Sequence, residues 1–187
     1  MPDWDQHYLL REAGEQSPAD VLIQNEHLLP VSGKVLDYAC GLGANACWLA
    51  AKGYSVTAWD GSAVAIDKIK KYAASQALTI HAEVRDLENN PPTAAEFDLV
   101  IVSFFLHRPT LKKLQAILKP GGLLCYQTFS GEQSNGRGPS NPEFRLQQGE
   151  LLKTFADMKI LFYREDNGVG NLQQGLRDQV MFIAAKK

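Results

Sequence analysis

The fold of this chain is decided by the stretch Val35-Leu36-Asp37-Tyr38-Ala39-Cys40-Gly41-Leu42-Gly43. It begins as a short apolar strand, and small residues and two glycines separate that strand from a helix predicted over 45–52. Gly41 and Gly43 permit backbone conformations that other residues avoid, and the small side chains before them let a ligand approach the main chain. The helix N-terminus behind the loop offers N–H groups and the positive end of the helix dipole. This order of strand, glycine-rich turn and helix predicts a cofactor loop.

Strand-like and helix-like segments alternate along the chain around this loop. Strands are predicted at 34–38, 55–60, 79–84, 97–102 and 123–128, and further helices at 63–75 and 111–118. Such alternation predicts a parallel sheet with right-handed crossovers. Two later strands, 159–164 and 179–185, lack an intervening helix and are expected to pair antiparallel at one sheet edge. The predicted fold class is therefore α/β: a Rossmann-like, doubly wound sheet of seven strands, mostly parallel, with the last strand antiparallel.

The length of 187 residues fits one domain, 1–187, with a single sizeable core. An N-terminal helical cap segment is expected over 1–30, with a helix over 19–29 that ends before Pro30. Residues 130–142 hold three Gly, two Pro, three Ser and two Asn, which predicts a long surface loop. Long loops are often lids or binding segments, so 130–142 is predicted to be an active-site loop.

Composition and charge argue against several classes of protein. Hydrophobic residues make up 45% and charged residues 21%, and 19 basic against 21 acidic side chains give a net charge of −2, without the basic excess typical of nucleic-acid binding. Because no apolar run reaches the ~20 residues of a membrane helix and the N-terminus lacks a signal-like stretch, a cytoplasmic protein without membrane contact is expected. The three Cys and four His are too scattered for structural zinc, and no metal is expected. We expect a small-molecule substrate and a monomer or homodimer.

The glycine-rich loop by itself is compatible with two cofactors. Residues 41–46 match the dinucleotide fingerprint, and Asp60, at the end of the second strand, lies 19 residues past Gly41, where a carboxylate can accept both hydroxyls of a ribose. A nicotinamide-dependent oxidoreductase therefore stays open. However, Asp37 precedes Gly41 by four residues, and a carboxylate there suits a methionine ammonium better than a pyrophosphate. The chain also leaves no room for a separate substrate domain. These features favour S-adenosylmethionine.

Five stretches carry a resemblance to a known family. They are Trp4-Asp5-Gln6-His7-Tyr8, then 35–46, 53–60, Asn141-Pro142-Glu143-Phe144 and 149–152. With them the sequence resembles class I S-adenosylmethionine methyltransferases over nearly its whole length. In particular it is similar to the small bacterial group that includes the tellurite-resistance methyltransferase and relatives of thiopurine methyltransferase. Two positions depart from the wider pattern: Ala39 replaces a usual Gly, and Ala44 replaces a frequent Arg, whose contacts are left in doubt.

The resemblance implies S-adenosylmethionine as cofactor, S-adenosylhomocysteine as product, and a role for each matched position. Asp37 and the loop backbone would hold the methionine part, Asp60 the ribose and Asp86 the adenine amino group, and the carbonyl of Ser103 would lie near the methionine ammonium. The complete predicted cofactor set is Asp37, Ala39, Cys40, Gly41, Gly43, Asp60, Gly61, Ser62, Asp86, Leu87 and Ser103. Cys40 is either a reactive thiolate or a small packing residue. Trp4 and Tyr8 either fold over the cofactor or pack a terminal segment.

The acceptor side is expected after the fourth strand, at Ser103-Phe104-Phe105-Leu106-His107-Arg108. This stretch lacks the Asn/Asp-Pro-Pro-aromatic pattern of methyltransferases that act on amino groups of DNA or protein. His107 is the candidate catalytic base, with a substrate hydrogen-bond donor or a helix-cap neighbour as alternative interpretations. The candidate substrate-binding residues are Phe105, Arg137, Arg145 and Arg177.

These observations predict methyl transfer to a small molecule. By resemblance, the acceptor would be a thiol, a thiopurine-like sulfur or a chalcogen oxyanion. Since the cofactor supplies the reactivity, the protein mostly supplies position and desolvation, and an easily ionised nucleophile needs no protein base. Two alternatives remain: an NAD(P)-dependent oxidoreductase, and a non-catalytic regulatory protein that binds the cofactor.

Overall fold

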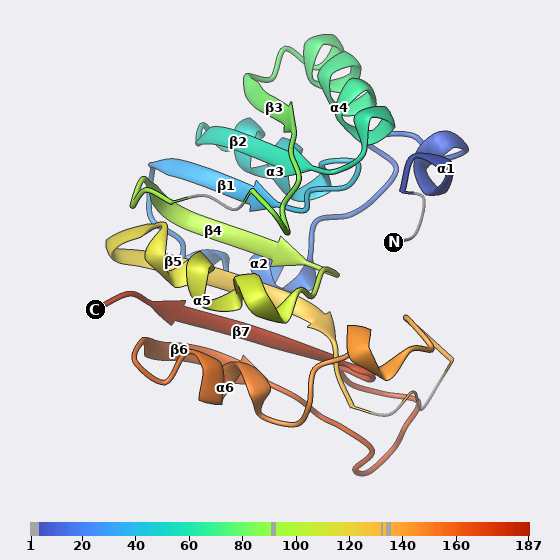
Figure 1. Ribbon diagram of the computed structural model, residues 1–187, viewed down its shortest axis with the longest axis vertical. Coiled ribbons are helices and arrows are strands. Elements are labelled where there is room, and N and C mark those ends of the chain that lie inside the picture. Colours follow the sequence, from blue (N-terminus) through green and yellow to red (C-terminus); the bar gives the residue numbers. More distant parts are fainter. Residues whose placement is uncertain (1–3, 91–92, 132, 134–135) are drawn as a thin grey trace.

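A computed structural model describes residues 4–90, 93–131, 133 and 136–187. Its centre is a seven-stranded sheet with the order β3-β2-β1-β4-β5-β7-β6 (Figure 1). The strands are β1 Lys34–Tyr38, β2 Ser55–Asp60, β3 Ile80–Val84, β4 Phe97–Ser103, β5 Leu118–Phe129, β6 Lys159–Arg164 and β7 Gln179–Ala185. The first five strands pair in parallel, and β7 runs antiparallel to both β5 and β6. The predicted fold class is confirmed, as is the antiparallel pairing of 159–164 with 179–185.

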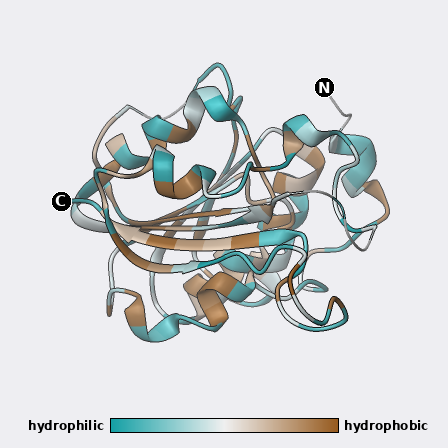
Figure 2. Cartoon of the chain, turned by 90° about the horizontal axis from the view of Figure 1, so that it is seen from below, coloured by the Kyte–Doolittle hydropathy of each residue, from teal (hydrophilic) through white to brown (hydrophobic). Residues whose placement is uncertain are grey.

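Helices cover both faces of the sheet. They are α1 Trp4–Leu9, α2 Asp20–Ile23, α3 Ala44–Ala51, α4 Ala63–Ser75, α5 Arg108–Ala116 and α6 Glu150–Thr154, with 3-10 turns η1 Glu26–Leu28 and η2 Pro142–Phe144. In Figure 1, α5 and α6 lie in front of the sheet and α2 and α3 behind it. Figure 2 shows hydrophobic colour along much of the central strands and hydrophilic colour on many of the surrounding loops and helices. Among the described residues, no helix is both long and apolar enough to cross a bilayer.

Alternation along the buried strands builds two separate cores. In β1, Leu36 and Tyr38 join a cluster with apolar residues of α5 and α6, whereas Val35 joins the cluster with α2, α3 and α4. Because successive side chains of a strand point to opposite faces, a strand buried on both faces is apolar at nearly every position. Asp37 is the exception in β1: it is completely buried, on the face that α3 covers.

The strand order reverses direction at β1, and this fixes where a ligand can bind. The chain passes from β1 to β2 and β3 on one side, then returns to form β4 on the other side of β1. The loops that follow β1 and β4 therefore leave in opposite directions. Such a switch point opens a crevice at the carboxyl ends of the strands. Both the glycine-rich loop and the 103–108 stretch begin at this crevice.

Two local predictions were wrong. The helix expected over 19–29 is interrupted, because the Asn25 side chain donates to the Val21 carbonyl at 3.0 Å and takes the acceptor that a continuing helix would use. Leu118, expected as the last residue of the helix over 111–118, is instead the first residue of β5, which also includes 119–122. Here Gly121 N donates to Lys186 O and Lys186 N donates to Gly122 O, both at 2.9 Å, so the strand is extended by pairing with residues beyond β7.

The start of α4 offers a local test of capping. Ser62 Oγ accepts from Ala65 N at 3.1 Å and donates to the Asp5 carboxylate at 2.5 Å. Ser62→Ala should lower the free energy of unfolding by about 1 kcal/mol, the usual cost of a lost N-cap, and should speed amide exchange in α1. Chemical denaturation and exchange would measure both effects. Ser75→Ala, at the other end of α4, is the matched control, and equal effects in the two variants would contradict the capping role.

Candidate functional site

A cavity of about 1090 Å³ opens at the carboxyl ends of the parallel strands. The loop after β1 lies between the end of β2 on one side and the end of β4 on the other, as the switch point requires. The sequence-predicted residues that line the cavity are Ala39, Cys40, Gly41, Asp60, Gly61, Ser62, Asp86, Leu87, Ser103, Phe105 and Arg137. Segments that are far apart in the sequence are thus brought together around one hollow.

Asp60 connects the end of β2 to the glycine-rich loop. Its two carboxylate oxygens accept from Gly41 N at 2.8 Å and from Ser62 N at 2.9 Å. Burial raises the pKa of the Asp60 carboxyl above its ordinary value, and the N–H groups of Ser62 and Gly41 oppose that rise. Each oxygen has a further lone pair that can accept from another donor. The side chain can therefore both shape the loop and bind hydroxyl groups.

Asp37 lies beneath the loop, outside the set of described residues that line the cavity. Its carboxylate accepts from Ala46 N at 3.0 Å, at the start of α3, and from the Asn45 side chain at 3.5 Å. Asn45 also donates to Ser103 Oγ at 2.9 Å, which connects Asp37 to the cavity wall. Burial raises the pKa of Asp37 to about 7, against the opposing effect of these hydrogen bonds.

The loop itself requires left-handed backbone. Ala39, Gly41 and Gly43 have φ values of 61°, 53° and 75°. Gly43 is not among the described residues that line the cavity. It packs against α4, where an added Cβ would lie 2.9 Å from Ile69 Cγ1. The two glycines thus serve different ends, since Gly41 faces the cavity and Gly43 allows helix packing. Ala39 adopts a conformation that glycine would adopt with less strain.

The N-terminal helix closes one side of the cavity. Trp4, His7 and Tyr8 of α1 all line it, and a Cβ on Gly41 would lie 2.9 Å from the Tyr8 hydroxyl. Asp5 of the same helix receives the Ser62 hydroxyl and, at 3.3 Å, the Val64 N–H. The sequence left open whether Trp4 and Tyr8 cover a ligand or only pack a terminus. Their place on the cavity wall supports the first interpretation.

The turn after β3 forms another part of the wall. The Asp86 carboxylate accepts hydrogen bonds from the Asn89 side chain and from the backbone N–H groups of Asn89 and Glu88. These bonds lower the pKa of Asp86, and the bond from the Asn89 side chain has the largest effect. Leu87 is buried, and its carbonyl accepts from the Tyr38 hydroxyl at 2.6 Å. Both residues are thereby fixed at the cavity edge by local bonds.

Aromatic side chains dominate the part of the cavity that follows β4 and β5. Phe104 has φ of 54°, unusual for a bulky residue, and its half-exposed ring lies 5.3 Å from that of Phe129. Phe105 packs edge-on against Tyr38. Gln179 completes this region because β7 is antiparallel, which puts its first residue opposite Phe129. Residues other than glycine with a positive φ, such as Phe104, occur preferentially at functional sites in proteins.

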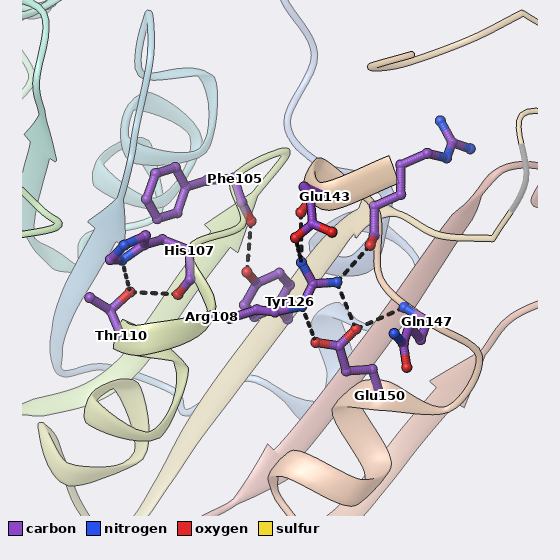
Figure 3. Close-up of polar contacts among 9 residues, drawn as sticks. Phe105, His107, Arg108, Thr110, Tyr126, Glu143, Gln147 and Glu150 are labelled. Atoms are coloured by element: carbon purple, nitrogen blue, oxygen red, sulfur yellow. Dashed lines mark hydrogen bonds and ion pairs between the residues drawn. The ribbon is translucent and has the colours of Figure 1, made fainter. Parts of the chain in front are cut away.

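His107 is not among the described residues that line the cavity, so its predicted catalytic role lacks structural support. It is the residue before α5, and its ring lies 3.3 Å from Thr110 Oγ1 and 3.8 Å from a Glu88 oxygen. Figure 3 shows the ring beside Thr110, whose hydroxyl also donates to the His107 carbonyl. This geometry corresponds to the helix-cap neighbour among the interpretations of His107.

Two of the three predicted anion-binding arginines lie elsewhere. Arg145 is buried, and all the hydrogen bonds described for its guanidinium go to backbone carbonyls. Arg177 donates to the carbonyls of Gln174, Asn167 and Asn171 in the loop between β6 and β7. Neither is a described lining residue, so the prediction that they bind substrate is not supported. Of these three arginines, Arg137 alone is a described lining residue.

Two of the three cysteines belong to the hydrophobic core. Cys40 and Cys125 are buried, and burial raises the pKa of both thiols, that of Cys125 to about 12. A thiolate at Cys40 is therefore disfavoured despite the nearby helix N-terminus. Within the described ranges, no group of three or more potential ligands is arranged to hold a metal ion.

Sequence reasoning missed Asp5, Phe129 and Gln179. The orientation of the strands could have identified the last two. The carboxyl end of a parallel strand and the amino end of an antiparallel neighbour meet at the same sheet edge, which puts Phe129 and Gln179 at the crevice. Asp5 carried no such signal, because its partner Ser62 is 57 residues away.

Comparison with known proteins relates the central part of the chain to one family. Residues 35–122 match the sequence profile of the family described as "Methyltransferase domain". This segment runs from β1 into β5 and contains the glycine-rich loop, Asp60 and Ser103. The sheet topology and the aligned TehB structure show the fold of class I methyltransferases, and residues 35–122, just under half of the chain, are similar in sequence to that family.

Within that class the chain is similar to the TehB group. It is 28% identical over 144 residues, 72% of this chain and 49% of the relative, to a probable S-adenosyl-L-methionine-dependent methyltransferase TehB of Haemophilus influenzae. The crystal structure of TehB from that organism aligns with a TM-score of 0.75 and 21% identity, and covers 98% of this chain and 67% of the other. Hemagglutinin 1 of Eikenella corrodens is 29% identical over 82% of this chain and 54% of that protein. The chain thus spans about half the length of these two sequence relatives.

Proposed function

We propose that this protein transfers a methyl group from S-adenosylmethionine to a small-molecule acceptor. The observation that carries the proposal is the position of Asp60, a carboxylate on the cavity wall at the end of β2 that is bonded to the backbone of Gly41. A carboxylate there suits the two hydroxyls of a ribose. The matched domain and the similarity to TehB support the same cofactor.

The remaining contacts to S-adenosylmethionine follow from the cavity wall. Asp86 and Leu87 would meet the adenine, with Gly61 and Ser62 beside it. The backbone at Ala39, Cys40 and Gly41 would hold the methionine part, and Asp37 would favour its ammonium from below. When bound, the cofactor supplies a methyl group activated by a sulfonium.

The start of α3 favours this cofactor over a dinucleotide. A pyrophosphate binds at a helix N-terminus by taking its N–H groups. Here the Asp37 carboxylate accepts from Ala46 N at 3.0 Å, so that donor is already used by a buried acid. A phosphate at the same place would lack the Ala46 N–H as a donor and would be repelled by the Asp37 carboxylate. This arrangement argues against the nicotinamide-dependent alternative.

We assign the acceptor to the aromatic end of the cavity. Ser103, Phe104, Phe105, Phe129 and Gln179 lie there, and none of these five side chains is a carboxylate or an imidazole. The protein's part is then to orient the acceptor and exclude water, and the acceptor brings an easily ionised atom of its own. Arg137 on the wall would attract a negative charge. A thiol, a thiopurine-like sulfur or a chalcogen oxyanion fits this description.

Calorimetric titration with S-adenosylhomocysteine and with NAD tests the cofactor. We expect binding heat with S-adenosylhomocysteine and none with NAD; tight NAD binding without adenosylhomocysteine heat would overturn the proposal. Methyl transfer would then be assayed with a panel of thiols, a mercaptopurine, selenite and tellurite. Cofactor binding without transfer to any of these acceptors would favour a non-catalytic regulatory protein.

A further inference from the structure

Several of the described residues between β5 and α6 surround one buried guanidinium. Arg145, which follows η2, is 4% exposed. Its Nε donates to Gly131 O at 2.8 Å, its Nη1 to Arg137 O at 3.1 Å and Pro139 O at 3.3 Å, and its Nη2 to Ser130 O at 3.0 Å and Asp178 O at 3.4 Å. Five carbonyls from 130–139 and 178 thus converge on one side chain. A guanidinium suits this role because it presents five N–H groups in a rigid plane.

Residues 136–139, two of whose carbonyls accept from Arg145, contribute directly to the cavity. Arg137 and Gly138 both line it, next to Phe129 at the end of β5. Gly138 lies so close to Phe129 that an added Cβ would be 2.4 Å from Cδ1 of the ring. The Arg145 guanidinium carbon is 5.6 Å from the centroid of the same ring. The position of residues 136–139 is therefore fixed from two sides, by the guanidinium and by the aromatic wall.

A second arginine holds the backbone of the first. Arg108, at the start of α5, donates through Nη2 to Arg145 O at 2.8 Å and through Nη1 to Glu143 O at 2.6 Å. It also makes a two-pronged ion pair with Glu150, at 2.8 and 3.0 Å, and Glu150 accepts from Gln147 N (Figure 3). Because α5 follows directly from the cavity-lining end of β4, this pair ties the 143–150 segment to the other wall of the acceptor end.

We propose that Arg145 is a positioning residue for the methyl acceptor. It acts through residues 136–139, which it holds against Phe129 so that Arg137 and Gly138 complete the acceptor end of the cavity. Arg108 holds the Arg145 backbone in the same arrangement. The inference rests on the proposed function for the identity of the acceptor site, whereas the folding of 136–139 around Arg145 can be tested without it.

The chain contains a matched control. Arg177 also donates to several backbone carbonyls, but these carbonyls belong to the loop between β6 and β7. Arg177 is not among the described residues that line the cavity.

The variant Arg145→Lys keeps the positive charge and loses the planar guanidinium. Amide exchange measured by mass spectrometry should become about tenfold faster over 136–146, the effect of one lost charge-assisted hydrogen bond. Arg177→Lys should loosen 166–175 and leave 136–146 unchanged.

Activity separates positioning from a general loss of stability. In Arg145→Lys, the KM for selenite or a thiol probe should rise about tenfold while kcat at saturation and the Kd for S-adenosylhomocysteine stay unchanged. Arg108→Gln should give the same pattern with a smaller effect. In Arg145→Ala, millimolar guanidinium chloride should restore the acceptor KM and equal NaCl should not, because the free ion can reach the same carbonyls.

The outcomes are distinguishable. Unchanged exchange over 136–146 in Arg145→Lys, or an equal increase throughout the chain, overturns the positioning role whatever the activity. Faster exchange with an unchanged acceptor KM overturns it as well. If the wild-type chain fails to bind S-adenosylhomocysteine, the proposed function fails, and the exchange contrast between the Arg145 and Arg177 variants still decides how the segment is held.

Discussion

Replacing Asp60 with alanine is expected to weaken binding of S-adenosylhomocysteine by about 1.5–3 kcal/mol, the scale of charge-assisted hydrogen bonds. The structure gives two reasons for this loss. The variant removes the acceptor proposed for the ribose, and it removes the acceptor that holds Gly41 N and Ser62 N in place. The loop and the ribose contact would therefore be weakened together. Calorimetric titration of the folded variant measures the effect.

Two further variants interpret the result. Asp60→Asn keeps one carbonyl oxygen for a backbone N–H and loses the charge, so it should bind more weakly than wild type and more tightly than Asp60→Ala. Asp67→Ala removes an exposed carboxylate from α4 and changes the net charge by the same amount as Asp60→Ala. An unchanged dissociation constant in a folded Asp60→Ala protein would remove Asp60 from the site. An equal loss in Asp67→Ala would attribute the effect to net charge.

The buried carboxyl of Asp37 is expected to make stability fall as pH rises. Its folded-state pKa of about 7 is raised from the ordinary value of 3.8 by burial. Between these two values the folded chain holds the proton more tightly than the unfolded chain, so the free energy of unfolding decreases with pH and levels off above 7. Over two pH units, from 5 to 7, the difference is about 2–3 kcal/mol.

Asp37→Asn isolates this contribution, because its side chain is neutral at every pH and retains an oxygen for Ala46 N. The stability of Asp37→Asn relative to wild type should increase from pH 5 to pH 7 in urea unfolding experiments. Asp67→Asn, on the exposed face of α4, should show no comparable trend. Parallel curves for wild type and Asp37→Asn would refute the effect of burial. If Asp37 faces the methionine ammonium, saturating S-adenosylhomocysteine should flatten the wild-type slope, since a nearby cation favours the carboxylate.

The sequence predicted features that depend on local patterns of apolar residues better than features that depend on single side-chain hydrogen bonds. The sheet was predictable because apolar strands alternate with helices, and the end of its second strand put Asp60 at the crevice. Asp86 and Ser103 were predicted from the resemblance to class I methyltransferases. Hydrogen bonds set the limits of the prediction. Asn25 interrupts the helix expected over 19–29 through a single side-chain bond that composition does not reveal.

The arginines show the same limit in the predicted site. A sequence gives the charge of Arg145 and its place beside the predicted active-site loop, and both properties are typical of an anion-binding residue. It does not give the carbonyls that converge on the side chain, which come from 130–139 and from Asp178 beyond β6. His107 was predicted as a base from its place after β4, and the α5 turn directs its ring to Thr110 instead.

The antiparallel course of β7 has a consequence for how such a domain can diversify. Residues that would hold the cofactor come from the ends of β1, β2, β3 and β4, whereas Arg137 and Gly138 lie after β5 and Gln179 is the first residue of β7. Exchanges in the segment after β5 or at the start of β7 would alter the acceptor end and leave the cofactor end intact. One scaffold can in this way acquire new acceptors by changing one loop and one strand end, without rebuilding the rest of the sheet.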